Sequence, residues 1–479
     1  MPSTTQGDPD IAVAQGYGNP VFLCSFSWQG WHFVLNIKKE ISYLFFMQKK
    51  EIIKSLIREF HHRLLPQYTP REIAIPLNAE KIVTLIGARR SGKTFLLYQL
   101  IDQLHREIDK TGLIFINFED ERLDLAVWEA DLILQAYREL YPDRDMTSCY
   151  FFFDEIQNLS GWERFVRRLY DTVSHHIFLT GSNARMLSSE ISTSLRGRSI
   201  SYEVFPLSFR EYLAFREIPV DFYIPETKGA IYNALESYLE FGGFPELVSV
   251  ADEDVRYRIL QEYFEVMLFR DLVERYEIKN VIALKFFIKR LFSSATKQVS
   301  IHRIYNDLKS AGIRIGKNSL YDFLEQAEAI FLVQTLKKYS PKVSVQEFGE
   351  RKIFIIDNGL LNSVVFKFSA DRGKAMEQVV FWELRRRGMQ FFFLKNGYEC
   401  DFVTISRSGR ITDVIQVCSD LSDPVTLSRE VKGISKTCKR LGVSQGAIIT
   451  YDQQDKIKED GIIINLVPLA VFIYQDHSI

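Results

Sequence analysis

A glycine-rich segment, Gly87–Thr94, constrains the fold of this chain more than any other feature. It follows the apolar run Lys81–Ile86, which predicts a buried strand, and it precedes Phe95–Leu104, which has the spacing of an amphipathic helix. A glycine-rich turn between a strand and a helix lets several backbone N–H groups converge on one phosphate chain, at a helix end that carries partial positive charge. The segment therefore predicts a phosphate-binding loop within an α/β fold.

The side chains of this phosphate loop suit the binding of ATP and Mg²⁺. Lys93 is expected to reach the β- and γ-phosphates, and the hydroxyl of Thr94 is expected to ligate the metal ion. The role of the pair Arg89-Arg90 stays open, because both side chains either are exposed or lean toward phosphate or a partner. The residues expected to contact the nucleotide are Gly87, Ala88, Arg89, Arg90, Ser91, Gly92, Lys93 and Thr94.

A second apolar run, Tyr150–Phe153, ends in Asp154 and Glu155. Four consecutive apolar residues predict a strand that is buried on both faces, as in the centre of a parallel sheet. The carboxyl ends of parallel strands meet at the edge where ligands bind, so both carboxylates are expected beside the phosphate loop. Asp154 is expected to hold Mg²⁺, and Glu155 is expected to orient and polarise the attacking water.

Polar residues that follow the next apolar strand, Ile177–Thr180, are candidates for sensing the γ-phosphate. Either Ser182 or Asn183 is expected to contact it, and Asn183 is included among the catalytic candidates. Further along, Arg196 or Arg198 is expected to stabilise charge on the phosphoryl group, from the same subunit or from a neighbour in a homo-oligomer. A surface turn with two solvated arginines fits the same spacing.

These motifs resemble those of AAA-type P-loop ATPases. They resemble more closely a family of archaeal and bacterial ATPases in which this core is fused to a C-terminal domain of unknown function. Two further segments, Phe205–Leu213 and Tyr238–Glu246, are similar to connecting segments of that family, and the resemblance extends from about Met47 to near the C-terminus. It implies a doubly wound core with a mostly parallel sheet that binds and hydrolyses ATP with Mg²⁺.

Apolar residues at helical spacing predict a lid over the nucleotide. The last expected lid helix carries Arg270, Asp271, Glu274 and Arg275 on one face, and these residues are expected to form solvated ion pairs of little energetic weight. The expected lid helices are Phe209–Phe215, Ala230–Phe241 and Val255–Tyr276.

Residues 281–345 are basic, with 11 Lys or Arg and 4 acidic residues (11 − 4 = +7), in a chain whose net charge is −1. Three expected helices followed by strands at Phe331–Tyr339 and Val343–Phe348 resemble a winged helix of the kind that binds duplex DNA. A winged helix used only for packing or protein contact is the alternative. The residues expected to enter the major groove are Lys317, Asn318, Ser319 and Tyr321, and those expected to contact phosphates are Lys337, Lys338 and Lys342.

Residues 372–479 alternate between expected helices and strands in an order that resembles a PD-(D/E)xK nuclease-like fold. The resemblance implies that Glu377, Asp401 and Gln416 occupy metal-binding positions. Cys418 stands where the family has its lysine, which puts water activation in doubt, and Lys395 is a weak substitute. An active nuclease is therefore disfavoured.

The expected organisation is a partly disordered extension over 1–46, an ATPase core over 47–205, a helical lid over 206–280, a winged helix over 281–348 and a nuclease-like α/β domain over 349–479. Met47 is an alternative start of the natural chain. Five widely spaced cysteines and the lack of a long apolar run predict a cytoplasmic protein with no transmembrane helix and no zinc site.

Three functions fit these patterns. The first is an ATP-hydrolysing switch or motor that engages duplex DNA through 281–348. The second is an ATP-dependent endonuclease, and the third is a non-catalytic, nucleotide-gated regulator of a protein partner. Glu155 favours hydrolysis, Cys418 disfavours the endonuclease, and the local charge disfavours the third function.

Overall fold

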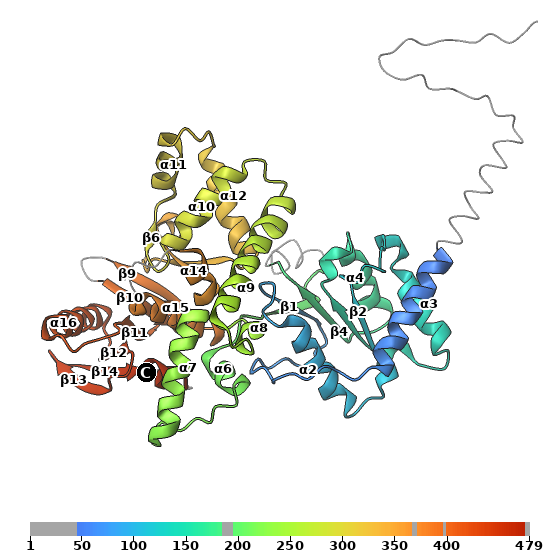
Figure 1. The fold of residues 1–479 in the computed structure, drawn as a ribbon, viewed down its shortest axis with the longest axis horizontal. Helices are drawn as coiled ribbons and strands as arrows, with labels where there is room; N and C mark the ends of the chain where they lie inside the picture. The colour runs from blue at the N-terminus through green and yellow to red at the C-terminus, as the bar shows by residue number, and fades with distance from the viewer. Residues whose placement is uncertain (1–45, 184–194, 366–370, 396–398, 475–479) are drawn as a thin grey trace, which may run out of the picture.

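The computed structural model describes residues 46–183, 195–365, 371–395 and 399–474. The expected N-terminal extension lies outside these residues, apart from residue 46. Figure 1 shows an N-terminal sheet at one side of the molecule and a C-terminal sheet at the other, with the lid helices α6 to α9 between them. The helices α10, α11 and α12 lie together at the top of the view in Figure 1.

The N-terminal unit is built on a five-stranded parallel sheet with the order β2-β3-β4-β1-β5. Helix α2 (Lys93–His105) covers one face, while α3 (Asp131–Leu140) and α4 (Trp162–Thr172) cover the other. Alternate residues of β1, β2, β3 and β4 point into the two cores, which explains why these four strands are mostly apolar. The strands are β1 (Ile82–Ile86), β2 (Leu113–Asn117), β3 (Tyr150–Asp154), β4 (Ile177–Gly181) and β5 (Ser199–Glu203).

The parallel α/β core is as expected, but strand β5 was not foreseen. It has a polar sequence and partly exposed side chains, so it lacks the apolar run that marks the other four strands. Its parallel pairing with β1 adds an edge strand beside the strand that precedes the phosphate loop.

The lid consists of α6 (Phe209–Phe215), α7 (Pro225–Phe241), α8 (Pro245–Val248) and α9 (Glu253–Val266), followed by a π-helical stretch, η6 (Met267–Glu274). The helix expected over Val255–Tyr276 is therefore present, but its second half is π-helical. The wider turn of a π-helix changes which side chains face inward, and here it buries Asp271 together with apolar neighbours.

The next unit contains α10 (Val281–Ser293), β6 (Gln298–Val299), α11 (Ile301–Ser310), α12 (Lys317–Ala329), β7 (Val333–Lys337) and β8 (Arg351–Ile355). Its three strands form an antiparallel sheet with the order β6-β8-β7. The expected strand Val343–Phe348 is wrong, because this segment is a short helix, α13. Pro341 and a side-chain turn, in which Ser340 Oγ accepts from the Lys342 N–H, start this helix. The strand that pairs with β7 is β8, beyond residue 348.

Helix α14 (Asn358–Val364) leads to the C-terminal unit, a six-stranded mixed sheet with the order β13-β14-β12-β11-β10-β9. Helix α15 (Arg372–Arg386) packs on one face and α16 (Pro424–Leu441) on the other. The elements β13, β14 and the final helix α17 (Leu469–Tyr474) were not foreseen. The strands are β9 (Gln390–Lys395), β10 (Glu399–Ile405), β11 (Ile411–Val417), β12 (Gln445–Thr450), β13 (Asp455–Glu459) and β14 (Ile462–Pro468).

No helix in the described part of the chain combines the length and the apolar character needed to cross a bilayer.

Candidate nucleotide-binding site

The phosphate loop lies between β1 and α2, at the carboxyl edge of the parallel sheet. Gly92 has a φ of 95°, in the left-handed region that favours glycine. A Cβ atom on Gly87 would lie 2.0 Å from the carbonyl oxygen of Val204, which follows β5. Both glycines are therefore required by the backbone, one for its conformation and one for the close approach of β5.

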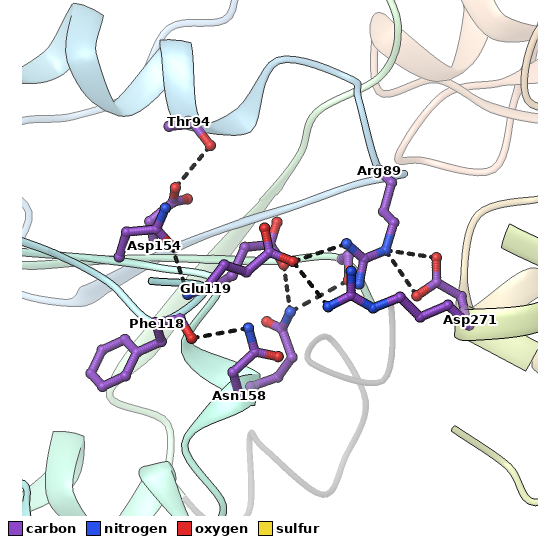
Figure 2. Close-up of polar contacts among 12 residues, drawn as sticks. Arg89, Thr94, Phe118, Glu119, Asp154, Asn158 and Asp271 are labelled. Atoms are coloured by element: carbon purple, nitrogen blue, oxygen red, sulfur yellow. Dashed lines mark hydrogen bonds and ion pairs between the residues drawn. The ribbon is translucent and has the colours of Figure 1, made fainter. Parts of the chain in front are cut away.

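Lys93 and Thr94 lie against the two carboxylates predicted from the second apolar strand. Lys93 Nζ donates to the carbonyl oxygens of Gly87 at 3.2 Å and Ala88 at 3.0 Å, and it lies 3.4 Å from Glu155 Oε1. Thr94 Oγ1 donates to Asp154 Oδ2 at 2.8 Å, as Figure 2 shows. Hydroxyl and carboxylate oxygens are the ligands that Mg²⁺ prefers, so this pair fits the ion.

Thr180, which sequence reasoning missed, holds both carboxylate residues in place. Its hydroxyl donates to Asp154 Oδ1 and accepts the backbone N–H of Glu155 at 2.8 Å. Glu155 has a φ of 48°, a left-handed conformation that turns the chain sharply after β3. The signal was a polar residue at the end of the apolar strand β4, the neighbour of β3 in the sheet.

The two adjacent carboxylates have different proton affinities. Burial raises the pKa of Asp154 to about 6, although hydrogen bonds from Thr180 and Thr94 and the charge of Lys93 act in the other direction. Burial also acts to raise the pKa of Glu155, but Lys93 and Gln157 outweigh it and hold this pKa below its usual range. Glu155 is thus kept as an anion that can accept a hydrogen bond from water.

A polar cluster beyond Glu155 distinguishes between the two sensor candidates. Gln157 Nε2 donates to Glu155 Oε2 and lies 3.4 Å from Ser182 Oγ. Arg275, which follows the π-helical stretch, places Nη2 3.4 Å from the same hydroxyl. Ser182 is buried in this cluster, whereas Asn183 is partly exposed. The geometry favours Ser182.

The two loop arginines both contact acidic residues of the lid. Arg89 Nε lies 2.9 Å from each carboxylate oxygen of Asp271, and its Nη1 lies 3.0 Å from Glu119 (Figure 2). Arg90 Nη1 lies 3.2 Å from Glu246 of α8. The expectation that Asp271 belongs to a solvated ion pair is wrong, because its side chain is 2% exposed and also lies 3.3 Å from Arg275.

Arg71 fixes the loop to the segment that follows β5, and sequence reasoning did not identify it. Its Nη1 donates to the Ser91 carbonyl oxygen, its Nη2 to that of Phe205 and its Nε to Glu211 Oε1, each at 2.8 Å. Glu211 also accepts the backbone N–H groups of Glu72 and Ser208. This buried network explains why the 205–213 segment is tied to the nucleotide site.

The structure does not bring Arg196 or Arg198 to the phosphate loop of its own chain. The backbone carbonyl oxygen of Arg198 accepts from the Ile82 N–H, at the start of β1. The side-chain Nε of Arg198 lies 2.7 Å from Asp171 Oδ1. The phosphate loop follows the other end of this five-residue strand, roughly 16 Å away at about 3.3 Å per residue. Arg198 therefore lies far from the phosphate loop of its own chain, and a role of either arginine in stabilising phosphoryl charge stays a prediction.

The three residues expected at metal-binding positions of the C-terminal unit lie together, away from the phosphate loop. Glu377 of α15, Asp401 of β10 and Gln416 of β11 are neighbours, and a lysine from β8, Lys352, lies between the first two. Lys395 is not among them, because its Nζ donates to Gln298 and lies 3.4 Å from Glu399. Cys418 Sγ donates to the Asp420 carbonyl oxygen.

Among the residues expected to contact DNA, those on α12 are the more accessible. Lys317, Asn318 and Tyr321 are exposed and Ser319 is partly buried, whereas Lys337 and Lys338 are partly buried and Lys342 is exposed. The segment after β7 lies against β9, where the Tyr339 N–H donates to the Phe393 carbonyl oxygen at 2.7 Å.

Comparison with known proteins finds two family models, each of which matches a part of the chain. Residues 79–213 match a family model described as an AAA domain, and residues 232–371 match one described as a domain of unknown function (DUF8612). The structure of the Aeropyrum pernix ORC1 protein in complex with DNA is 12% identical, covers 66% of this chain and 91% of that chain, and gives a TM-score of 0.29.

Two curated relatives match most of the chain. An uncharacterized protein of Haemophilus influenzae is 30% identical over 80% of this chain and 92% of its own length. The uncharacterized protein MJ1544 of Methanocaldococcus jannaschii is 35% identical over 83% of this chain and 89% of its own length. The chain carries an AAA domain and belongs to the family that includes MJ1544.

Proposed function

We propose that this protein binds and hydrolyses ATP in a Mg²⁺-dependent reaction and uses the reaction to change the position of its lid and the units that follow it. The observation that carries the proposal is the convergence of Lys93, Thr94, Asp154 and Glu155 at one edge of the parallel sheet. This set contains a cation for phosphate, oxygen ligands for a metal ion and an anionic acceptor for water.

Each side chain has a distinct task in this reaction. Lys93 donates to two loop carbonyl oxygens, and it exchanges these contacts for phosphate oxygens when ATP binds. Thr94 and Asp154 would hold Mg²⁺, and the ion would supply positive charge against the phosphates. Glu155 accepts a hydrogen bond from the attacking water and orients it. Ser182 lies next to Gln157, in a position to contact the γ-phosphate.

Coupling to the lid follows from the two loop arginines. Arg89 and Arg90 belong to the loop that encloses the phosphates, and their partners Asp271 and Glu246 belong to the lid. A change in loop conformation on ATP binding alters both ion pairs at once. The lid therefore takes different positions in the ATP-bound and nucleotide-free protein.

The unit over residues 281–355 is a winged helix in this proposal, with α12 as the helix that enters the major groove. The order of helices and strands and the antiparallel sheet β6-β8-β7 support this assignment. Exposed Lys317, Asn318 and Tyr321 supply base and phosphate contacts. Lys337 and Lys338 contribute less, because the neighbouring segment pairs with Phe393.

Control of a protein partner without DNA is the second candidate, and the partial burial of Lys337 and Lys338 favours it. One experiment separates the two functions. Steady-state ATP hydrolysis is measured with and without duplex DNA, for the wild type and for a variant in which Lys317, Asn318 and Tyr321 are replaced by alanine. We expect DNA to raise the rate of the wild type and not of the variant, with equal rates in the absence of DNA.

Two results would oppose the proposal. Equal stimulation of both proteins by DNA would exclude α12 as the contact. An ATP turnover that Glu155→Gln leaves unchanged would exclude the assigned hydrolytic site. Turnover that depends on Glu155 but never responds to DNA would favour the protein-partner function.

A further inference from the structure

A buried lysine lies between two carboxylates at the junction of the three-stranded sheet and the C-terminal unit. Lys352 Nζ is 2.9 Å from Glu377 Oε1 and 2.8 Å from Asp401 Oδ1. The lysine side chain is 8% exposed and each carboxylate side chain is 13% exposed. The ammonium group therefore bridges both acids in a site largely shielded from water.

The other polar groups of this site also have partners within the chain. Asp401 Oδ2 accepts the Val417 N–H at 3.0 Å, and Gln416 Oε1 accepts the Asp401 N–H at 3.2 Å. Thr296 forms a side-chain hydrogen bond with Glu377. The oxygens that would ligate a cation are thus occupied by N–H and O–H donors and by the ammonium group of Lys352.

An ammonium group and a divalent cation cannot share this position. Mg²⁺ requires oxygen ligands at about 2.0–2.1 Å and larger divalent cations at about 2.3–2.6 Å, which places the ion where Lys352 Nζ now lies. One ammonium charge also balances only one of the two carboxylates.

We propose that Lys352 is an internal counter-ion that takes the place of a divalent cation between Glu377 and Asp401 and keeps this site free of metal. The lysine comes from β8, whereas the carboxylates come from α15 and β10. The same contact therefore clamps the three-stranded sheet onto the C-terminal sheet, beside the Tyr339–Phe393 backbone hydrogen bond. The site is latent: removal of the ammonium group leaves two carboxylates and an amide oxygen able to bind one ion.

The test counts Mn²⁺ ions bound per chain by electron paramagnetic resonance, on full-length protein without nucleotide. The proteins are the wild type, Lys352→Met, Lys352→Met with Asp401→Asn, and Lys395→Met as a control at an exposed lysine. We expect Lys352→Met to bind one Mn²⁺ more than the wild type, and we expect Asp401→Asn to abolish that ion. The control should match the wild type. Thermal unfolding should show stabilisation by Mn²⁺ in Lys352→Met alone.

Three outcomes would overturn the proposal. The first is an Asp401-dependent Mn²⁺ ion already present in the wild type. The second is a folded Lys352→Met protein that gains no ion. If Lys352→Met is insoluble, Lys352→Ala and Lys352→Gln are prepared in the presence of Mn²⁺ instead. If neither of these two variants binds an Asp401-dependent ion, the proposal is overturned in the same way. The third is Mn²⁺-dependent plasmid cleavage by the wild type that Lys352→Met abolishes, which would make Lys352 a catalytic lysine.

Discussion

Arg89 Nε lies 2.9 Å from both carboxylate oxygens of Asp271, a residue 182 positions further along the chain. Asp271 also lies 3.3 Å from Arg275, whose Nη2 is 3.4 Å from the Ser182 hydroxyl. A single buried carboxylate of the lid therefore contacts an arginine of the phosphate loop and an arginine that approaches the end of β4. These contacts connect the phosphate loop, the end of β4 and the lid in one polar network.

The first prediction concerns this carboxylate. Asp271→Asn leaves Arg89 and Arg275 close together without their shared counter-charge in a mostly buried setting. We expect the free energy of unfolding to fall by about 3–5 kcal/mol, as is typical when one partner of a buried ion pair is removed. Urea unfolding measures this change.

The matched control is Glu246→Gln, which disrupts the other pair between loop and lid. Both members of that pair are more than half exposed, with side chains 63% and 51% accessible. An exposed pair contributes about 0–1 kcal/mol, so the control should stay close to the wild type. Equal losses in the two variants would contradict the special role of Asp271.

The second prediction separates ATP binding from hydrolysis. Lys93→Ala removes the cation that faces the phosphates, so binding of Mg·ATP should be lost. Glu155→Gln keeps the hydrogen-bonding shape but removes the anion, so binding should persist while turnover falls by roughly 10²–10⁴-fold, the usual contribution of a general base. Equilibrium binding of a fluorescent ATP analogue and phosphate release measure the two properties.

Glu107→Gln serves as the control for this pair of variants. Glu107 is exposed and follows α2, away from the carboxylates of the site. Its replacement should change neither binding nor turnover. Loss of nucleotide binding in Glu155→Gln would show that Glu155 acts in binding rather than in hydrolysis.

The third prediction concerns two glycines of helix α7 and the turn after it. A Cβ atom on Gly242 would lie 1.9 Å from Asp357 Oδ1, and Gly242 has a φ of 76°. Gly242→Ala therefore forces the lid away from Asp357 and should lower the melting temperature by several degrees. Gly229 lies within the same helix with no atom within 4 Å of its Cβ position, so Gly229→Ala should leave stability unchanged or raise it by about 0.5–1 kcal/mol.

Similar effects of the two alanine substitutions on thermal unfolding would contradict the close contact at Gly242. Circular dichroism follows the unfolding of both variants under the same conditions. Each variant adds one methyl group to a glycine. The two sites differ only in their backbone conformation and in the space around the Cβ position.

The fourth prediction is a pH dependence from Asp357. Burial raises its pKa from 3.8 to about 6, although backbone N–H groups of Gly243, Leu360 and Gly359 act to lower it. The folded protein therefore holds this proton more tightly than the unfolded chain does. Its stabilising contribution is complete below about pH 4 and is lost as the pH rises to about 6.

Asp357→Asn does not titrate and supplies the reference for this effect. The stability of the wild type relative to the variant should decrease by roughly 3 kcal/mol across this interval, at about 1.4 kcal/mol for each pKa unit. Chemical unfolding at a series of pH values measures the difference. Parallel curves would show that the three N–H donors keep Asp357 ionised in the folded state.

Local sequence patterns predicted that Lys93, Thr94, Asp154 and Glu155 lie together, but they did not predict the long-range contacts. Lys93, Thr94 and Asp154 were expected together because the ends of adjacent parallel strands meet at one edge. The partners of Arg89 and of Glu377 were not foreseen, since an ion pair between distant segments leaves no periodic signal in the sequence. Asp271 was misjudged for a further reason, because its burial depends on a π-helical turn that helical spacing does not reveal.

The last prediction tests the proposed contact between α12 and duplex DNA. Lys317 is exposed at the start of this helix, and the surrounding segment carries a local charge of +7 (11 − 4). Each protein cation that neutralises a phosphate releases counter-ions, so the affinity should fall about tenfold or more between low and moderate salt. Lys317→Ala should weaken binding and make the salt dependence shallower by about one counter-ion, whereas Lys342→Ala, beside the turn that docks near β9, should have a smaller effect. Fluorescence anisotropy with a labelled duplex measures both properties, and an affinity that does not change with salt would exclude binding through phosphate contacts.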